Sequence, residues 1–180
     1  MGLFCVRIGN VFYQEGFYEK KEIKMVIIRK AKEEDFPRLE ELYEELEKDA
    51  VLYQPEHFVF SPKGTRSEQM KEFLDSDFQV MFVAENDGEV IGFAHLVLIP
   101  AKKVPCLKSQ TSLYLQDLVV ASEFRSQGIG TILMNEAKKY GKENGADFFR
   151  TQVFPQNIDG MRFYKRNGFS EKMITIECPF

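Results

Sequence analysis

The sequence predicts an α/β layered domain in which a mixed, mostly antiparallel central sheet is flanked by helices. Strand and helix patterns alternate along the chain, two strand patterns are joined by a short glycine-containing turn, and a glycine-bearing turn connects a further strand to a helix. The expected order is strand, two helices, three strands, helix, strand, helix and strand. Interleaved helices and strands are typical of layered α/β domains, and 180 residues are enough for one such domain.

The first half of the domain begins with an expected strand at residues 25–31. A helix follows from Glu33, because apolar side chains recur at helical spacing while glutamates occupy the opposite face, which is interpreted as solvated. The apolar stripe consists of Phe36, Leu39, Leu42, Tyr43 and Leu46. Residues 50–66 contain prolines and a glycine and are expected to form a loop. Residues 67–74 are expected to form a short second helix with Ser67 as its cap.

Three strands are expected next. Residues 79–85 and 89–98 suit a hairpin around Asn86-Asp87-Gly88. A basic connector at residues 100–110 then leads into a strand at residues 112–120.

The last part of the domain is expected to hold two helices and two strands. The first helix is indicated by Ile129, Ile132, Leu133, Ala137 and Tyr140, and Asn144-Gly145 is its stop signal. A strand ending at residues 152–154 follows, and Asn157 is a suitable cap for the second helix. Residues Glu171–Cys178 are expected to form the final strand.

Residues 1–24 lie outside the pattern of the domain, which spans residues 25–180. One hypothesis is that the natural start is Met25 and that the preceding purine-rich codons are an upstream region read as protein. The alternative is a structured extension, because Cys5–Ile8 and Val11–Tyr13 suit a small hairpin around a two-residue turn. The segment lacks the long apolar run of a signal peptide.

The segment from Arg125 to Thr131 lies between the strand at residues 112–120 and a helix. The first amides of a helix lack internal partners and the helix dipole adds positive charge there, while glycines allow phosphate oxygens to approach the backbone. A diphosphate is therefore the expected ligand. Gly128 and Gly130 are two positions apart and no lysine precedes Thr131, so the dinucleotide-binding and P-loop patterns do not fit.

The same segment resembles the pyrophosphate loop of the GNAT superfamily of acyl-CoA-dependent N-acetyltransferases. That loop has Gln or Arg, two variable residues, Gly, one variable residue, and Gly or Ala, and Arg125, Gly128 and Gly130 fill it. Residues 157–169 resemble the closing element of the family, N-x-x-G-x-x-F-Y-x-x-x-G-F. The resemblance covers roughly residues 25–178. It implies a GNAT-like fold, acetyl-CoA as cosubstrate, and acetyl transfer to a primary amine of a small molecule or peptide.

By this resemblance, two stretches of backbone hold the cofactor. The diphosphate is bound by the loop, which comprises Arg125, Ser126, Gln127, Gly128, Ile129, Gly130 and Thr131. The pantetheine arm pairs like an added strand with the backbone of Leu118, Val119 and Val120. The side chains of these three residues also suit the core of a sheet.

Two side chains of the closing element have implied roles. Asn157 would hydrogen-bond the pantetheine arm, and its alternative role is to cap a helix. Tyr164 would be the general acid, because a phenol with a pKa of about 10 can protonate a departing thiolate of similar basicity. The alternative for Tyr164 is an aromatic packing residue beside Phe163.

The general base stays unassigned. Many GNAT proteins carry a glutamate at positions corresponding to Tyr114 or Gln116, neither of which can accept a proton at neutral pH. Asp117 would point to the opposite face if the strand alternates regularly. Further titratable candidates are Glu85, His57 and His95. We therefore expect the amine to lose its proton through water.

Composition excludes several other classes of protein. The net charge of −4 argues against nucleic acid as a partner, and no apolar run approaches the ~18–20 residues that span a bilayer. Three unpatterned cysteines favour a reduced cytoplasm over a disulfide framework. The two histidines are far apart and the cysteines lack ligand-like spacing, so we expect no metal site.

The acceptor and the detailed activity stay open. The loop at residues 50–66 and the connector at residues 100–110 would shape the acceptor site. Another acyl group could replace acetyl, because the loop reads only the diphosphate of CoA. A non-catalytic acyl-CoA-binding or regulatory module is the other alternative, since the expected base position lacks a carboxylate. A homodimer is possible.

Overall fold

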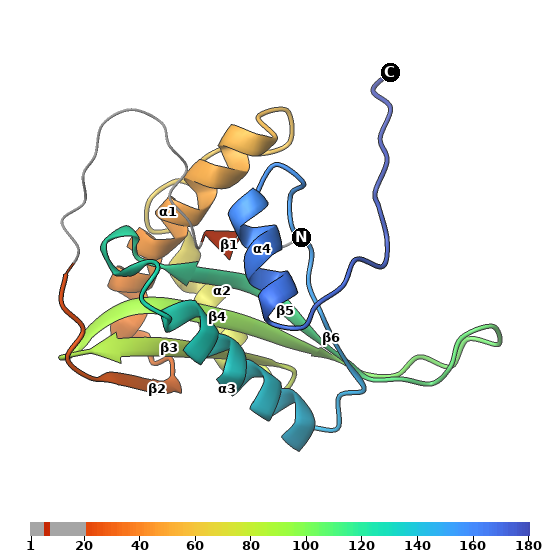
Figure 1. Ribbon diagram of the computed structural model, residues 1–180, viewed down its shortest axis with the longest axis horizontal. Coiled ribbons are helices and arrows are strands. Elements are labelled where there is room, and N and C mark those ends of the chain that lie inside the picture. Colours follow the sequence, from red (N-terminus) through yellow and green to blue (C-terminus); the bar gives the residue numbers. More distant parts are fainter. Residues whose placement is uncertain (1–5, 8–20) are drawn as a thin grey trace.

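The computed structural model describes Val6, Arg7 and residues 21–180. Within this part of the chain, a six-stranded sheet forms the centre of the molecule (Figure 1). Its strands are β1 (Val6–Arg7), β2 (Val26–Lys30), β3 (Gln79–Asn86), β4 (Glu89–Ile99), β5 (Ser112–Val120) and β6 (Phe148–Arg150). Their order is β1-β5-β4-β3-β2, and β6 also pairs with β5.

Strands β2 to β5 are antiparallel neighbours, whereas β1 and β6 both run parallel to β5. Strand β4 takes one edge of β5, so β1 and β6 share the other, which we call the outer edge of β5. Strand β6 pairs with residues 112–114 near the start of β5. Strand β1 pairs with Leu118 and Val119 near its end. The predicted mixed, mostly antiparallel sheet is confirmed.

Helices cover both faces of the sheet. The helical segments are η1 (Glu33–Asp35), α1 (Phe36–Tyr53), α2 (Arg66–Leu74), η2 (Ser122–Phe124), α3 (Ile129–Glu143) and α4 (Ile158–Arg166). Helices α1 and α2 pack on one face, where the Tyr43 ring lies 4.7 Å from Phe93 and Phe73 stacks on His95. Helix α3 packs on the opposite face, where Tyr140 meets Phe82.

Local sequence signals explain much of this arrangement. The predicted apolar stripe of α1 is buried against the sheet, and Leu39, Leu42 and Leu46 are fully covered. Asp87 and Gly88 form the β3–β4 turn with φ angles of 54° and 81°. Positive φ at both central residues matches the twist of a tight hairpin.

Helix α1 is longer than predicted, because the first residues assigned to the 50–66 loop are helical. Ala50 is fully buried, and the Tyr53 ring packs 5.7 Å from that of Phe154. The helix ends at Tyr53, since the residue before Pro55 is sterically disfavoured in helical conformation.

Helix α2 begins at Arg66 rather than at Ser67. Thr65 occupies its N-cap position, so the predicted Ser67 cap is wrong. Ser67 lies instead in the first turn of α2, where its hydroxyl donates to Glu40 of α1 at 2.6 Å.

The predicted final strand at Glu171–Cys178 is wrong. No strand is assigned there, and Met173, Ile174 and Ile176 are between 84% and 92% exposed. Apolar sequence alone does not make a strand, because a strand is stable only beside a partner. The preceding strand, β6, ends at Arg150 rather than at residues 152–154, because the chain then leaves β5.

The N-terminal prediction is only partly open to comparison. Apart from Val6 and Arg7, the expected hairpin at residues 5–13 lies outside the described residues. Those two residues pair with β5. Contacts with the domain also reach back beyond Met25, since the Lys24 amide donates to Asn86 Oδ1 at 3.1 Å and Ile23 packs against the core.

None of the described helices is both long enough and apolar enough to cross a membrane.

Candidate functional site

The outer edge of β5 has two different neighbours along its length. Strand β6 pairs with residues 112–114, and the chain that follows β6 then diverges from β5 toward α4. Thr151 keeps contact with the edge, because its hydroxyl donates to the Leu115 carbonyl at 3.0 Å. Farther along, Leu118 and Val119 are opposite Val6 and Arg7 of β1. The residues predicted to pair with pantetheine therefore lie on this edge, beyond the point where β6 leaves it.

The loop after β5 places helical amides at the end of this edge. Ser126 and Gly128 have φ angles of 62° and 89°, and α3 begins at Ile129. Such backbone at Gly128 favours glycine. The Thr131 and Ile132 amides bond to the Gly128 carbonyl, whereas the earlier amides of an α-helix have no intrahelical acceptor. Backbone donors and the helix dipole thus meet where the diphosphate is expected.

Arg125 occupies the start of the loop, but its side chain turns inward. It is 4% exposed, its Nε donates to the Val120 carbonyl at 2.8 Å, and its Nη2 lies 2.6 Å from Glu45 Oε2 on α1. The guanidinium therefore ties the end of β5 to α1. Only the backbone of Arg125 belongs to the proposed phosphate loop.

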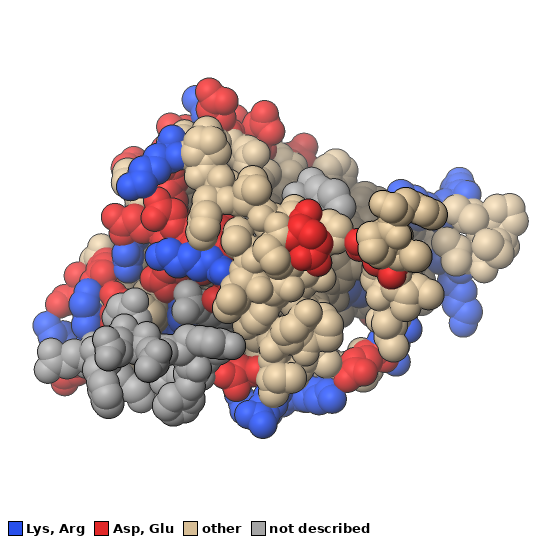
Figure 2. Space-filling view, turned by 90° about the horizontal axis from the view of Figure 1, so that it is seen from above, with Lys and Arg blue, Asp and Glu red and all other residues tan. Residues whose placement is uncertain are grey.

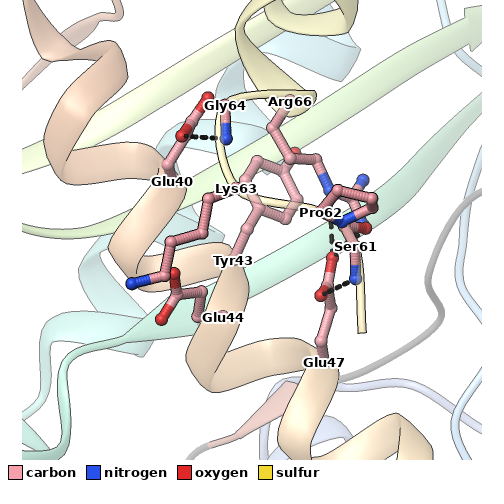
Figure 3. A pocket seen from close by; sticks show the side chains of 9 residues that line it. All are labelled: Glu40, Tyr43, Glu44, Glu47, Ser61, Pro62, Lys63, Gly64 and Arg66. Atoms are coloured by element: carbon pink, nitrogen blue, oxygen red, sulfur yellow. Dashed lines mark hydrogen bonds and ion pairs between the residues drawn. The ribbon is translucent and has the colours of Figure 1, made fainter. Parts of the chain in front are cut away.

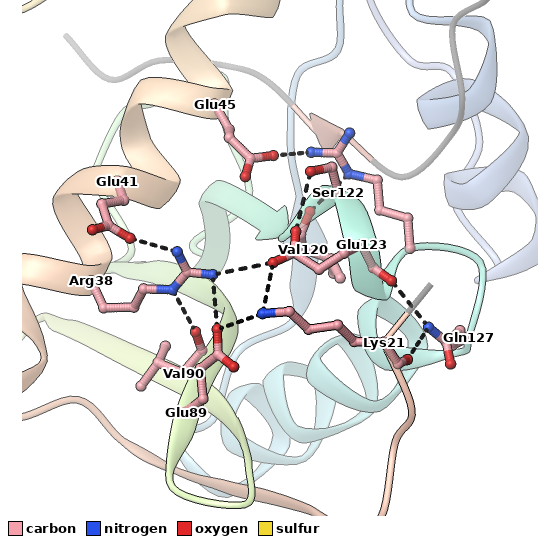
Figure 4. Close-up of polar contacts among 11 residues, drawn as sticks. Lys21, Arg38, Glu41, Glu45, Glu89, Val90, Val120, Ser122, Glu123 and Gln127 are labelled. Atoms are coloured by element: carbon pink, nitrogen blue, oxygen red, sulfur yellow. Dashed lines mark hydrogen bonds and ion pairs between the residues drawn. The ribbon is translucent and has the colours of Figure 1, made fainter. Parts of the chain in front are cut away.

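The loop is also fastened to the chain at Lys21 (Figure 4). Gln127 Nε2 donates to the carbonyls of Lys21 and Glu123, each at 3.3 Å. Lys21 Nζ lies 3.5 Å from carboxylate oxygens of Glu89 and Glu123. Burial raises the pKa of the Glu123 carboxyl, but hydrogen bonds and the Lys21 ammonium outweigh burial and hold it below its ordinary value.

Asn157 caps α4. Its Oδ1 accepts the Gly160 amide at 2.8 Å, and the side chain is 4% exposed. A Cβ at position 160 would meet the Asn157 side chain at 2.7 Å, so only glycine allows this close approach. The capping role considered from the sequence is therefore confirmed, and contact with pantetheine stays a prediction.

Tyr164 lies beside the outer edge of β5. Its hydroxyl is 3.5 Å from Thr151 Oγ1, which bonds to the Leu115 carbonyl. The ring packs edge-on against Phe163 and Phe169, and the residue is 4% exposed. The phenol is thus held at the point where β5 and the chain beyond β6 separate.

A β-bulge changes the faces of the possible bases on β5. His95 is opposite Asp117 but Leu96 is opposite Leu115, so Gln116 is the extra residue. Regular alternation would put Tyr114 and Asp117 on opposite faces. With the bulge, both face α1 and α2, and the prediction for Asp117 is wrong.

Asp117 lies in a buried polar group beneath α1. Its Oδ2 accepts from the Tyr43 hydroxyl at 3.3 Å and is 3.4 Å from His95 Nδ1. Burial raises the pKa of the Tyr114 phenol, and the nearby Asp117 charge raises it further. His95 Nε2 is 2.9 Å from Gln79 Oε1. These contacts support a structural role for His95 and Asp117.

The other possible bases lie in separate contacts. Glu85 bonds to Arg29 at 2.7 Å on β2 and β3. His57 lies 2.9 Å from Glu177 of the C-terminal tail. Neither contact involves the outer edge of β5.

Carboxylates of α1 clamp the α1–α2 loop in place (Figure 3). Glu47 is 2% exposed and accepts from the Ser61 amide at 2.8 Å, from Ser61 Oγ at 2.6 Å and from Arg66 Nη2 at 2.6 Å. Glu40 accepts from the Gly64 amide at 3.1 Å. The acidic face of α1 is interpreted from the sequence as solvated. The structure differs, because part of this face holds the α1–α2 loop.

The charge of Glu47 is stabilised in this clamp. Burial raises the pKa of its carboxyl, but the hydrogen bonds from Ser61 and the Arg66 guanidinium lower it by more. The resulting pKa is below the ordinary value. The Arg66 guanidinium also lies over the Tyr43 ring, 4.6 Å from its centroid, and the clamp lines a small pocket beside α1.

Charged side chains are unevenly distributed over the surface. Seen from above, many Asp and Glu side chains gather toward the left, where Figure 1 places α1, while uncharged residues dominate the centre (Figure 2). Basic side chains lie at the right-hand tip of Figure 2, where Figure 1 places the connector between β4 and β5. Among the described residues, no group of three or more His, Cys, Asp or Glu is placed to hold a metal ion.

Two residues of the site were not predicted from the sequence. Thr151 contacts Tyr164, and Lys21 contacts the loop through Gln127. A threonine after a short strand and a lysine before a first strand carry no local functional signal. Only the meeting of distant segments reveals them.

Comparisons with known proteins agree with this geometry. The profile of the Acetyltransferase (GNAT) family matches residues 37–169. An uncharacterized N-acetyltransferase of Methanocaldococcus jannaschii is 28% identical over 84% of this chain and 64% of its own length. Spermidine N(1)-acetyltransferase of Thermoplasma acidophilum is 32% identical over 79% of this chain and 86% of its own length. The chain spans between 52% and 66% of the first curated relatives it matches.

Solved structures share the fold. A Bacillus halodurans protein superposes with a TM-score of 0.82 at 20% identity, covering 86% of this chain and 99% of its own. An aminoglycoside N-acetyltransferase in complex with CoA gives a TM-score of 0.68 at 21% identity, covering 87% and 95% of the two chains. With the family profile matching most of the sequence, the chain belongs to the GNAT acetyltransferase family.

Proposed function

We propose that the protein transfers an acetyl group from acetyl-CoA to a primary amine of a small molecule or peptide. Besides family membership, one observation carries the proposal. The loop and the first amides of α3 lie at one end of the outer edge of β5, and Tyr164 lies toward the other. A diphosphate, an extended arm and a thioester would meet these parts in the order in which they occur in acetyl-CoA.

Each part then has a defined task. Amides at the start of α3 bind the diphosphate. Backbone groups of Leu118, Val119 and Val120 pair with the pantetheine arm, and the Asn157 amide group donates to it. This holds the thioester near Tyr164, on the outer edge of β5.

Acetyl transfer forms a C–N bond and breaks the thioester C–S bond. The neutral amine attacks the carbonyl carbon, and the departing thiolate takes the proton of the Tyr164 phenol. Water takes the extra proton from the nitrogen once it has attacked, because Gln116 stands where a carboxylate base was considered, and a proton from water then restores the Tyr164 phenol. Neither step requires a metal ion in this proposal.

The acceptor would lie beside α1 and the clamped α1–α2 loop. Relatives are named for acetylation of spermidine, streptothricin and aminoglycosides, all of which carry amines. These names support an amine acceptor. We also propose that the protein acts in the cytoplasm, which the free Cys106 and Cys178 support. We further propose that it forms a homodimer, and light scattering measures its mass directly.

An acceptor screen tests the proposal. Thiol release from acetyl-CoA is measured with spermidine, an aminoglycoside and a lysine-containing peptide, and propionyl-CoA replaces acetyl-CoA in a parallel set. We expect amine-dependent thiol release that is fastest with acetyl-CoA. Faster release from propionyl-CoA would indicate a different acyl group.

A non-catalytic acyl-CoA-binding module is the second candidate, favoured by Gln116 in place of a carboxylate. Such a protein would be stabilised thermally by CoA without amine-dependent thiol release. A bound ligand at one hundred times its dissociation constant stabilises the native state by about 2.7 kcal/mol. NAD and ATP serve as controls for stabilisation by other adenine nucleotides that carry a diphosphate but lack both the 3′-phosphate and the pantetheine arm of CoA.

A further inference from the structure

Strand β1 occupies part of the edge that the proposed function assigns to pantetheine. Val6 is opposite Leu118 and Arg7 is opposite Val119, in parallel register. Strand β1 also contacts α1 and α4, and Figure 1 shows it between these two helices. Strand β1 and helix α4 therefore meet at the outer edge of β5.

One strand edge cannot hold both partners at the same residues. A neighbouring strand lies about 4.8 Å away and uses the backbone groups that face it. A pantetheine arm paired with the same groups would need the same space. Resting on the proposed function, we propose that β1 competes with the pantetheine arm of acyl-CoA for Leu118 and Val119, so that the N-terminal segment is a built-in inhibitor of cofactor binding.

Covalent attachment to the domain allows the short strand β1 to compete with a free ligand. Lys21 is fastened to the phosphate loop through Gln127, and Lys24 is paired with Asp87 at 2.9 Å. The chain therefore enters the domain beside the site. A tethered partner acts at an effective concentration on the order of millimolar, so a pairing of two residues can compete although the isolated peptide would bind weakly.

Competition weakens acyl-CoA binding in inverse proportion to the fraction of time that the edge is free of β1. If the edge is free about one-tenth of the time, the apparent affinity falls about tenfold. The amides that bind the diphosphate belong to α3 and are not part of the β1 pairing. Ligands that lack the pantetheine arm therefore escape the competition.

A double-proline variant of the full chain tests this competition. Adjacent amides of a strand point to opposite edges, so Val6→Pro with Arg7→Pro removes whichever donor faces β5. Gln14→Pro with Glu15→Pro is the matched control in the same segment but outside β1. Calorimetry measures the dissociation constants of CoA and of adenosine 3′-phosphate 5′-diphosphate, which lacks pantetheine.

We expect CoA to bind about tenfold more tightly to the β1 variant than to the wild type and the control. The nucleotide fragment should bind all three proteins equally. Equal CoA affinity in all three would overturn the competition and leave the proposed function intact. The same holds if the control binds CoA as tightly as the β1 variant. Absence of CoA binding in all three would overturn the proposed function and this inference with it.

Hydrogen exchange of the wild type gives a second measurement. Saturating CoA should displace β1 and speed exchange in a peptide containing Val6 and Arg7 about tenfold, while the nucleotide fragment should not. Unchanged exchange with bound CoA would show that both partners are accommodated, and the inference would be wrong.

Discussion

The two sides of the candidate site are built from different parts of the chain. On the side of β5 and α3, which we call the loop side, the contacts proposed for the diphosphate come from backbone amides at the start of α3, which follows Gly128. On the side of α1 and α2, which we call the clamp side, side chains such as Glu47 and Arg66 hold the α1–α2 loop in place. Backbone-built sites require glycines at fixed spacing and so leave a sequence pattern. Sites built from side chains depend on partners that are distant in sequence.

Tyr164→Phe gives the largest expected effect and tests whether a side chain matters on the loop side. The ring still packs against Phe163 and Phe169, so CoA affinity should be retained. General acid catalysis contributes about 10²–10⁴-fold, and kcat should fall by that factor if thiolate departure limits the rate. Steady-state thiol release measures kcat and KM.

Tyr140→Phe on α3 is the matched control and should keep wild-type kcat, because Tyr140 packs against Phe82 on the opposite face. Wild-type turnover of the Tyr164 variant, also with a poorer thiol leaving group, would reduce Tyr164 to a packing residue.

Gly128→Asp tests the backbone-built cradle. A carboxylate beside the bound diphosphate costs several kcal/mol, so CoA should bind at least about 100-fold more weakly. Gly128→Asn isolates the charge, because Asn and Asp adopt the left-handed backbone of Gly128 with similar ease. Calorimetry measures both dissociation constants, and equal affinity of the two variants would argue against a diphosphate at this position.

Glu47→Gln tests the clamp side. It removes a buried charge that holds Ser61 and Arg66, so the free energy of unfolding should fall by about 2 kcal/mol. The melting temperature should fall by about 4–8 °C, without a change in CoA affinity. Glu44→Gln on the exposed face of α1 is the control. A loss of CoA affinity without loss of stability would break the separation of the two sides.

The same variant should show a pH-dependent penalty. The pKa of Glu47 is lowered in the folded protein, so its stabilising contribution is present above the unfolded value of 4.5 and is lost as pH falls through the folded value. The stability difference between wild type and Glu47→Gln should be full at pH 7 and shrink below about pH 4.5. Urea unfolding at several pH values measures it, and a constant difference would contradict the ionised clamp.

Gln127→Ala is expected to have the smallest effect. Its side chain bonds only to backbone carbonyls of Lys21 and Glu123 among the described contacts. If the cradle is made of backbone, CoA affinity should change by less than about threefold. A larger loss would mean that side chains also bind the diphosphate.

Elements with strong local signals were predictable. Strand β5 has the predicted bounds, and α3 follows the glycine turn as expected. The Asn157 cap and the apolar stripe of α1 are also where their patterns indicate. Periodicity, turn chemistry and caps act within a few residues, so the sequence alone carries them.

Elements that depend on distant partners were not predictable. The expected strand at Glu171–Cys178 has the side chains of a strand but no assigned pairing. The bulge at Gln116 depends on how β4 meets β5, and it moves Asp117 to the face of α1. A one-residue irregularity reverses the face of a side chain, and alternation within one strand does not reveal it.

By itself, the sequence determined the layered fold, the glycine loop before α3 and the tyrosine of α4, because each depends on neighbouring residues. Tertiary structure alone decided that Arg125 turns inward to Glu45, that Glu47 holds the α1–α2 loop, and that β1 lies on the outer edge of β5. Each of these joins segments far apart in the chain. These contacts are stabilised by burial and hydrogen bonding that exist only after the elements have packed together.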